Sequence, residues 1–239
     1  MKSSQIKVGS LTVTLVQGVE NPKGAVILCH GFGASGDDLV SLAEEMVKVD
    51  GKFRDLAFLF PQAPIEMDQS MGFVSRAWWM IDVDRILELA EKGKLRDLKS
   101  ESPEELPNCN NMIVEVIEHA CSTFDLPSTQ VVIGGFSQGA MLTTDVALTL
   151  DKPLGGLVVW SGTLICEDKW QSLVGDVNFP VYQSHGTLDP ILPFENAIAL
   201  CNLFADARVD IDFTEFEGPH TIPISGMKGA LKMIRKAIL

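Results

Sequence analysis

The chain has 239 residues, of which 46% are hydrophobic, and this is enough for one α/β domain with a sizeable core. Its formal net charge of −13 argues against a nucleic-acid partner, because phosphate binding needs clustered lysine and arginine. The five cysteines include no C-x-x-C pair, which argues against a disulfide framework or a zinc site and favours a cytoplasmic protein. No secretory signal opens the chain and no apolar run could span a bilayer, so we expect no stable membrane insertion.

Strand-like and helix-like segments alternate after an amino-terminal hairpin. The hairpin is expected at 6–8 and 11–16, with its turn at Gly9 and Ser10. The alternation predicts a mostly parallel sheet with helices on both faces, in a single domain over residues 1–239. Strands are expected near 25–30, 56–60, 130–134, 155–160, 180–184 and 209–216, and helices near 37–49, 108–124, 138–150, 194–206 and 223–238.

A glycine-rich segment, 30–36, follows the apolar run 25–29. Glycines directly after a strand let backbone N–H groups point at a developing oxyanion. We therefore expect the N–H group of Phe32 to stabilise such a charge. The His30 side chain is expected to have a structural role.

The region 61–107 interrupts the alternation with a long loop at 67–80 and a charged, helix-like piece at 83–91. A loop of this length in a compact domain is usually functional or disordered, and this one is too apolar for a disordered tail. Methionine and tryptophan suit an adaptable groove for acyl chains, and tryptophan also suits a core beneath the loop. Met71, Phe73, Trp78 and Trp79 are the candidate substrate-binding residues, and we expect one tryptophan to face the site and the other to pack inward.

A G-x-S-x-G pentapeptide, 135–139, stands between the β-branched run 131–134 and a helix-like stretch. Small residues on either side of the serine let a strand and a helix approach closely and leave the hydroxyl exposed. We expect Ser137 to be a nucleophile and the N–H group of Gln138, the next residue, to be the second oxyanion donor. Asp145, farther along the helix, is expected to face solvent or to be paired, and we assign it no role.

An acid and then a histidine follow the nucleophile along the chain in this kind of acyl-transfer site. Asp189 comes just after the strand-like run 180–184, and His220 comes just after the alternating run 209–216. Open parallel sheets place their chemistry at such strand ends. The sequence therefore predicts Asp189 as the acid and His220 as the base.

Other residues compete for these two roles. Asp168 and Asp176 follow an earlier strand, at a position that some hydrolases use for the acid. Of the four histidines, His185 precedes Asp189 and breaks the expected chain order, and His119 lies within a helix-like stretch. His220 is the histidine that fits the order.

Taken together, these segments resemble the phospholipase/carboxylesterase family of α/β-hydrolases, which includes the acyl-protein thioesterases. The resemblance implies the α/β-hydrolase fold and hydrolysis of carboxylic esters or thioesters, with Ser137, Asp189 and His220 as the triad. The segment 82–107 is longer and more charged than in the compact thioesterases, which leaves the substrate open. The matching segments span nearly the whole chain: 30–33 with 37–39, 60–64, 76–79, 134–139, 185–186 with 189–190, and Gly218 with His220.

The predicted chemistry needs no metal and no organic cofactor. A carboxylesterase is the first hypothesis, and an acyl-protein thioesterase or lysophospholipase is the alternative. The substrate is then a small-molecule or lipid-like ester, or an acylated protein. A non-catalytic ligand receptor on the same scaffold is an alternative of another class. Ile191, Leu192 and Ile222, which neighbour the predicted acid and base, are further candidates for the substrate groove.

Overall fold

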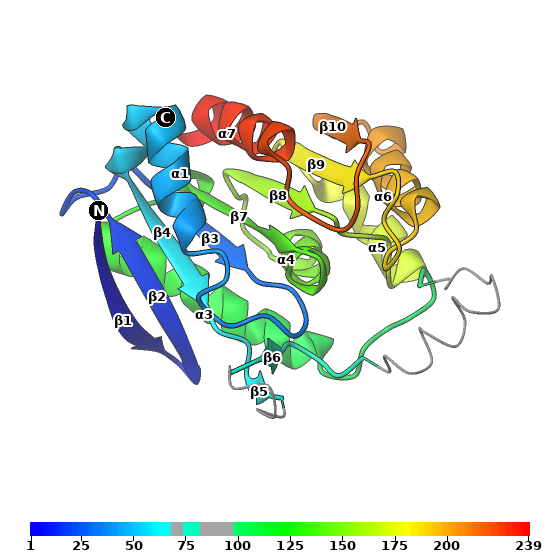
Figure 1. Ribbon diagram of the computed structural model, residues 1–239, viewed down its shortest axis with the longest axis horizontal. Coiled ribbons are helices and arrows are strands. Elements are labelled where there is room, and N and C mark those ends of the chain that lie inside the picture. The colour runs from blue at the N-terminus through cyan, green and yellow to red at the C-terminus, as the bar shows by residue number, and fades with distance from the viewer. Residues whose placement is uncertain (68–73, 82–97) are drawn as a thin grey trace.

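The computed structural model describes residues 1–67, 74–81 and 98–239. Within these ranges an eight-stranded sheet runs in the order β1-β2-β4-β3-β7-β8-β9-β10 (Figure 1). β2 pairs antiparallel with β1 and β4, and every other pairing in this sheet is parallel. The strands are β1 (Lys2–Val8), β2 (Leu11–Gln17), β3 (Gly24–Cys29), β4 (Leu56–Pro61), β7 (Val131–Phe136), β8 (Gly156–Trp160), β9 (Val181–Gly186) and β10 (Ile211–Phe216).

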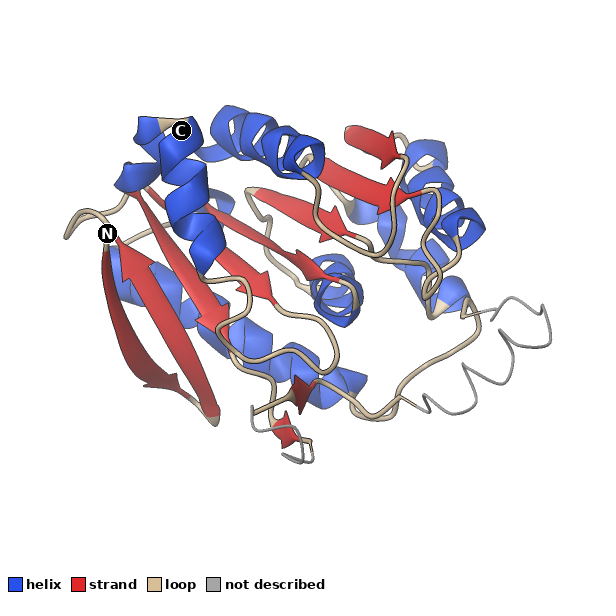
Figure 2. Ribbon diagram, in the orientation of Figure 1, coloured by secondary structure: helices blue, strands red, loops and turns tan. Residues whose placement is uncertain are grey.

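Helices cover both faces of the sheet (Figure 2). The buried residues of the sheet and its helices form two clusters. One cluster includes residues of α1 and α7, and the other includes residues of α3, α4, α5 and α6. Strands covered on both faces read as continuous apolar runs, and β3 and β4 are buried at every position. The helices are α1 (Ser41–Val49), α3 (Leu106–Phe124), α4 (Gln138–Thr149), α5 (Glu167–Leu173), α6 (Phe194–Asp206) and α7 (Ile224–Ile238).

The sheet topology fixes where a ligand can enter. β3 lies between β4, the strand that follows it in the sequence, and β7, from which the later strands extend to the other edge. Ligands of open α/β sheets bind outside the carboxyl ends of the strands at such a switch point. The segment after β3 and the serine turn after β7 meet at this place.

The predicted fold class is confirmed, and the expected strands and helices are present. Most bounds are closely similar, but β1 begins at Lys2, four residues before the expected hairpin strand 6–8. α1 begins at Ser41 rather than near 37, because turns occupy 37–40. The predicted 67–80 loop is wrong in part, since β6 (Arg76–Ala77) pairs antiparallel with β5 (Ile65–Glu66). Helix α5 was not expected, because seven residues with a single buried side chain give no periodic pattern. The helix-like piece at 83–91 lies outside the described residues. No helix of the described ranges is long and apolar enough to cross a membrane.

Candidate active site

Ser137 lies in a sharp turn between β7 and α4. Its backbone has φ 55° and ψ −118°, a conformation that residues other than glycine rarely adopt. The Ser137 N–H donates to the Trp160 carbonyl at 2.9 Å, which ties the turn to the end of β8. A Cβ atom at Gly139 would lie 2.1 Å from the Cys29 carbonyl oxygen, so only glycine lets α4 start this close to β3.

The segment after β3 is held in place by hydrogen bonds to β6. Gly33, with φ 77°, donates its N–H to Arg76 O at 2.9 Å, and Arg76 N–H donates to Ala34 O at 2.9 Å. His30 stabilises the same segment: its Nε2 accepts from Ala63 N–H at 3.1 Å, and its Nδ1–H donates to Gly31 O at 2.8 Å. Burial lowers the pKa of this imidazole, which agrees with a neutral ring in a structural role.

Phe32 and Gln138 present backbone N–H groups at two neighbouring strand ends. Phe32 lies in the segment after β3, and Gln138 is the first residue of α4. The first N–H groups of a helix have no acceptor within the helix and lie at its positive end. Both residues thus follow neighbouring parallel strands, β3 and β7, at the same edge of the sheet.

The Gln138 side chain has a structural role, which the sequence did not reveal. It is fully buried, its Oε1 accepts from Trp78 N–H at 3.0 Å, and its Nε2 donates to Trp79 O at 2.8 Å. The amide thus fixes the two tryptophans to the start of α4. A buried amide must find partners, but nothing in the sequence says which distant segment supplies them.

Asp189 and His220 meet at the ends of β9 and β10. His220 Nδ1 lies 2.6 Å from Asp189 Oδ2, and the other carboxylate oxygen accepts the N–H groups of Ile191 and Leu192 at 2.8 and 2.9 Å. The Phe136 ring packs against the imidazole with a centroid distance of 4.7 Å. Since Nδ1 is engaged as a donor, the Nε2 lone pair of His220 is available to accept a proton.

His185 is a second histidine on the same carboxylate. Its Nε2 lies 2.9 Å from Leu192 O and 3.2 Å from Asp189 Oδ2, and because both are acceptors this nitrogen carries the proton. Its Nδ1 has no hydrogen-bond partner among the described residues. The chain-order argument excluded His185 as the base but did not reveal this contact, and a histidine four residues before the acid is the only signal the sequence offers.

The charge of Asp189 follows from these contacts. Burial alone would raise the pKa of the carboxyl, but hydrogen bonds from His185 and His220, the charge of His220 and the Leu192 N–H hold it well below its usual range. The group is therefore an ionised carboxylate at neutral pH. An ionised carboxylate keeps the proton of His220 on Nδ1 and can stabilise the imidazolium form.

A cavity of about 420 Å³ opens onto these groups, and Ser137, His220 and Phe32 all line it. This volume lies within the range of small-molecule sites. Most of its wall is apolar, so it suits a hydrocarbon chain better than a polar ligand. The apolar side chains that line it include Trp79, Ile81, Leu98, Met141, Ile165 and Leu192.

The structure brings some of the predicted substrate-binding residues to the cavity and leaves others out. Trp79, Ile191 and Leu192 line it. Trp78 packs inward instead, fully buried, with its indole N–H donating to His30 O at 3.0 Å. Ile222 packs against the cluster around α1 and α7 and is not among the residues that line the cavity. Met71 and Phe73 lie outside the described residues.

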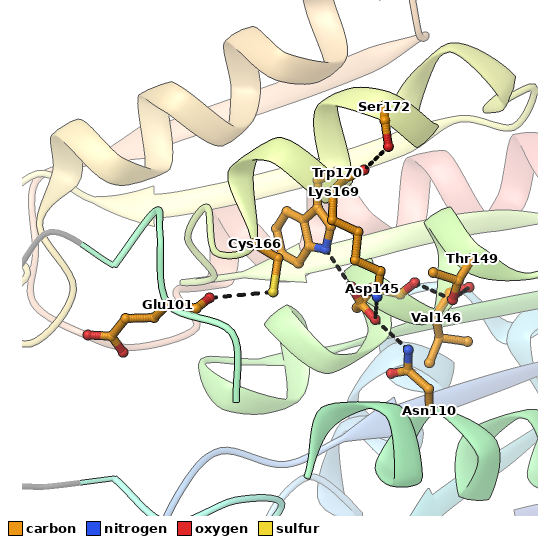
Figure 3. Close-up of polar contacts among 9 residues, drawn as sticks. All are labelled: Glu101, Asn110, Asp145, Val146, Thr149, Cys166, Lys169, Trp170 and Ser172. Atoms are coloured by element: carbon orange, nitrogen blue, oxygen red, sulfur yellow. Dashed lines mark hydrogen bonds and ion pairs between the residues drawn. The ribbon is translucent and has the colours of Figure 1, made fainter. Parts of the chain in front are cut away.

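The other aspartates considered in the sequence analysis have surroundings different from those of Asp189. Asp168 and Asp176, the rivals of Asp189, are both exposed. Asp145 does not face solvent; it is fully buried and paired with Lys169, with further hydrogen bonds from Trp170 and Asn110 (Figure 3). Within the described ranges, no group of three or more His, Cys, Asp or Glu side chains could hold a metal ion.

Comparison with known proteins identifies the family of this chain. The sequence matches the phospholipase/carboxylesterase family over residues 12–238. The chain belongs to this family. It is 29% identical to acyl-protein thioesterase 1 of Candida albicans over 226 residues, which cover 90% of this chain and 93% of that protein. It is 31% identical to acyl-protein thioesterase 1 of Eremothecium gossypii over 188 residues, 76% and 73% of the two chains.

Solved structures share the fold. Esterase PE8 matches with a TM-score of 0.75 and 24% identity, over 100% of both chains. A carboxylesterase from Mesorhizobium loti matches with a TM-score of 0.74 and 13% identity, over 98% of both. The predicted family and the α/β-hydrolase fold are therefore confirmed, and the family supports a serine hydrolase of the ester or thioester type.

Proposed function

We propose that this member of the family is a carboxylesterase that hydrolyses carboxylic esters through an acyl-enzyme on Ser137. One observation carries the proposal: Ser137 and His220 line the same apolar cavity, and His220 Nδ1 lies 2.6 Å from a buried oxygen of Asp189. The strained backbone of Ser137 adds support, because such conformations persist where the surrounding structure enforces them and cluster at active sites.

Acylation begins when His220 accepts the Ser137 proton on Nε2 as Oγ attacks the ester carbonyl carbon. The N–H groups of Phe32 and Gln138 stabilise the tetrahedral oxyanion. Asp189 holds the productive tautomer of His220 and stabilises the imidazolium. When the intermediate collapses, the imidazolium gives its proton to the leaving alcohol, and the acyl group remains on Ser137.

Deacylation repeats these steps with water. His220 accepts a proton from water as the oxygen attacks the acyl-enzyme carbonyl, and the same oxyanion donors act again. Collapse of the second intermediate returns the proton to Ser137 and releases the carboxylic acid. The chemistry proceeds with side chains and backbone groups of this chain alone, and we propose no cofactor.

A thioesterase or lysophospholipase activity is the second candidate, and the acyl-protein thioesterase relatives favour the thioesterase. A matched panel of p-nitrophenyl esters and acyl-thioesters with the same acyl chains separates the two. We expect a higher kcat/KM on the esters. Preference for the thioesters at every chain length would make the protein a thioesterase. Turnover of neither substrate class would favour the remaining alternative, a non-catalytic ligand receptor.

Trp79 should set the size of the acyl groove, whereas Trp78 should not. Trp79→Leu enlarges the cavity, so the ratio of kcat/KM for a dodecanoyl ester to that for a butanoyl ester should rise about tenfold, within the roughly 1–3 kcal/mol that one methylene contributes in an apolar pocket. Trp78→Phe is the control, because it removes the indole N–H that donates to His30 O and keeps a smaller aromatic side chain. It should lower the melting temperature and leave the ratio unchanged. An unaltered ratio in Trp79→Leu would assign that side chain to the scaffold.

The pH dependence of activity should report one proton. The pKa of Asp189 is depressed, so its stabilising contribution is complete above the unfolded value of about 3.9 and is lost only as pH falls toward the folded pKa. Between pH about 5 and 8 the carboxylate therefore stays ionised. The acid side of the log kcat/KM curve should therefore have a slope of one, because only the general base takes up a proton there. A slope of two in this window would mean that Asp189 also takes up a proton.

We further propose one catalytic domain over 1–239, in which 61–107 is a loop-like or lid-like insertion in the sequence, and a cytoplasmic location. The free state of all five cysteines supports a reducing compartment. Small-molecule or lipid-like esters are the proposed ligands, with acylated protein as the alternative.

A further inference from the structure

A buried carboxylate lies outside the proposed catalytic machinery, on the helix that begins at Ser137. Asp145 is fully buried on α4, and its two oxygens accept hydrogen bonds from partners on two other helices. Lys169 Nζ lies 2.9 Å from Oδ1 and 2.7 Å from Oδ2, and the Trp170 indole N–H donates to Oδ1 at 2.6 Å. Asn110 Nδ2 on α3 donates to Oδ2. A buried charge with this many donors is well satisfied and holds its neighbours in one arrangement.

Figure 3 shows that Lys169 and Trp170 both reach Asp145 from α5. This helix has only seven residues, too few to be stable without tertiary contacts. Trp170 is its one buried side chain. The position of α5 relative to α4 therefore depends on its contacts with Asp145 and on the packing of Trp170.

The amino-terminal end of α5 holds part of the cavity wall. We call residues 98–103 the wall segment; it has no helical or strand hydrogen bonding, and its Leu98, Glu101 and Pro103 line the cavity. The Cys166 N–H donates to Glu101 O at 3.0 Å, and the Glu167 N–H donates to Lys99 O at 2.8 Å. Ile165, the residue before Cys166, lines the cavity as well.

These contacts form a continuous chain from α4, the helix that begins after Ser137, to the wall segment of the cavity. We propose that Asp145 is a positioning residue for substrate selection, which fixes α5 through Lys169 and Trp170 and so holds the wall segment at a defined distance from Ser137. This inference rests on the proposed esterase function. It assigns to Asp145 the sharpness of the acyl-chain preference, because a fixed wall discriminates between chain lengths and a loose one does not.

The test measures kcat/KM on p-nitrophenyl esters from butanoyl to dodecanoyl for two variants. Asp145→Asn removes the charge, and Trp170→Phe removes the indole N–H donor and leaves a smaller aromatic side chain on α5. In both, the ratio between the preferred ester and the butanoyl ester should fall about fivefold, within the range of discrimination that apolar pockets give. Activity on the butanoyl ester should stay within about threefold of wild type, because the triad and the oxyanion donors are unchanged.

Two control variants separate positioning from general loss of stability. Ser172→Ala removes an exposed hydrogen bond to Lys169 O on α5, and Thr149→Val removes the bond from its hydroxyl to Asp145 O on α4. Both should leave the chain-length ratio at its wild-type value, whatever they do to the melting temperature. A ratio that followed the melting temperature across all variants would overturn the proposal.

Hydrogen exchange gives a readout that does not depend on activity. The Cys166 and Glu167 amides should exchange faster in Asp145→Asn and Trp170→Phe, while amides in the middle of α4 keep their protection. Unchanged protection at these two amides, or an unchanged ratio in both folded variants, would refute the role of Asp145. If wild type hydrolysed none of the esters, the proposed function would fail, and the exchange data would still decide whether Asp145 holds the wall segment.

Discussion

Ser137→Ala should lower kcat by a factor on the order of 10⁶ on the best ester, as loss of a triad nucleophile does in other serine hydrolases. The turn should persist, because the hydrogen bond from the residue 137 N–H to Trp160 O and the close packing of Gly139 on Cys29 do not involve the hydroxyl. A melting temperature close to that of wild type will verify this. Ser172→Ala, on an exposed face of α5, is the matched control and should keep full activity.

A fluorophosphonate probe extends the same prediction to covalent chemistry. The probe should label wild type and Ser172→Ala and leave Ser137→Ala unlabelled. Equal labelling of Ser137→Ala would move the nucleophile to another residue.

Asp189→Asn should lower kcat by about 10⁴ while the chain stays folded. In the wild-type protein each carboxylate oxygen of Asp189 faces donors only. Oδ1 accepts from the N–H groups of Ile191 and Leu192, and Oδ2 faces the two histidines. An amide must turn its NH₂ group toward one of these sets. If it faces His220, Nδ1 becomes the acceptor, and Nε2 carries the proton and cannot act as a base.

Two exposed acids supply the controls for this substitution. Asp168→Asn and Asp176→Asn should retain wild-type kcat, because neither side chain lies beside His220 and both face solvent. Circular dichroism should show that all three variants are folded. Near-normal activity in Asp189→Asn, with the loss in one of the other two, would transfer the acid to the end of β8.

The central groups of the site could be predicted because they follow strand ends. Ser137, Asp189 and His220 each follow a recognisable apolar or alternating run, and topology brings the ends of parallel strands to one edge. The same reasoning predicts Phe32 and Gln138 as oxyanion donors, because a backbone N–H group needs only the right turn after a strand. The strand pattern thus predicts most of the fold and the order in which the site residues occur along the chain.

Side-chain direction outside regular elements could not be predicted. Trp78 and Trp79 are adjacent at the end of a two-residue strand, so no periodicity indicates which one packs inward. The structure decides this through the bond from the Trp78 indole to His30 O. The environment of Asp145 could not be predicted either, because its partners Lys169 and Trp170 lie on a helix too short to show a periodic hydrophobic pattern.

The most direct test of the central claim is to locate the acyl group. Wild-type protein is mixed with excess p-nitrophenyl ester, quenched in acid during turnover, digested and analysed by mass spectrometry. The acyl mass should appear on the peptide that contains Ser137, and fragmentation should place it on that residue. An acyl group on another residue, or ester turnover with no acylated peptide at any quench time, would contradict an acyl-enzyme on Ser137.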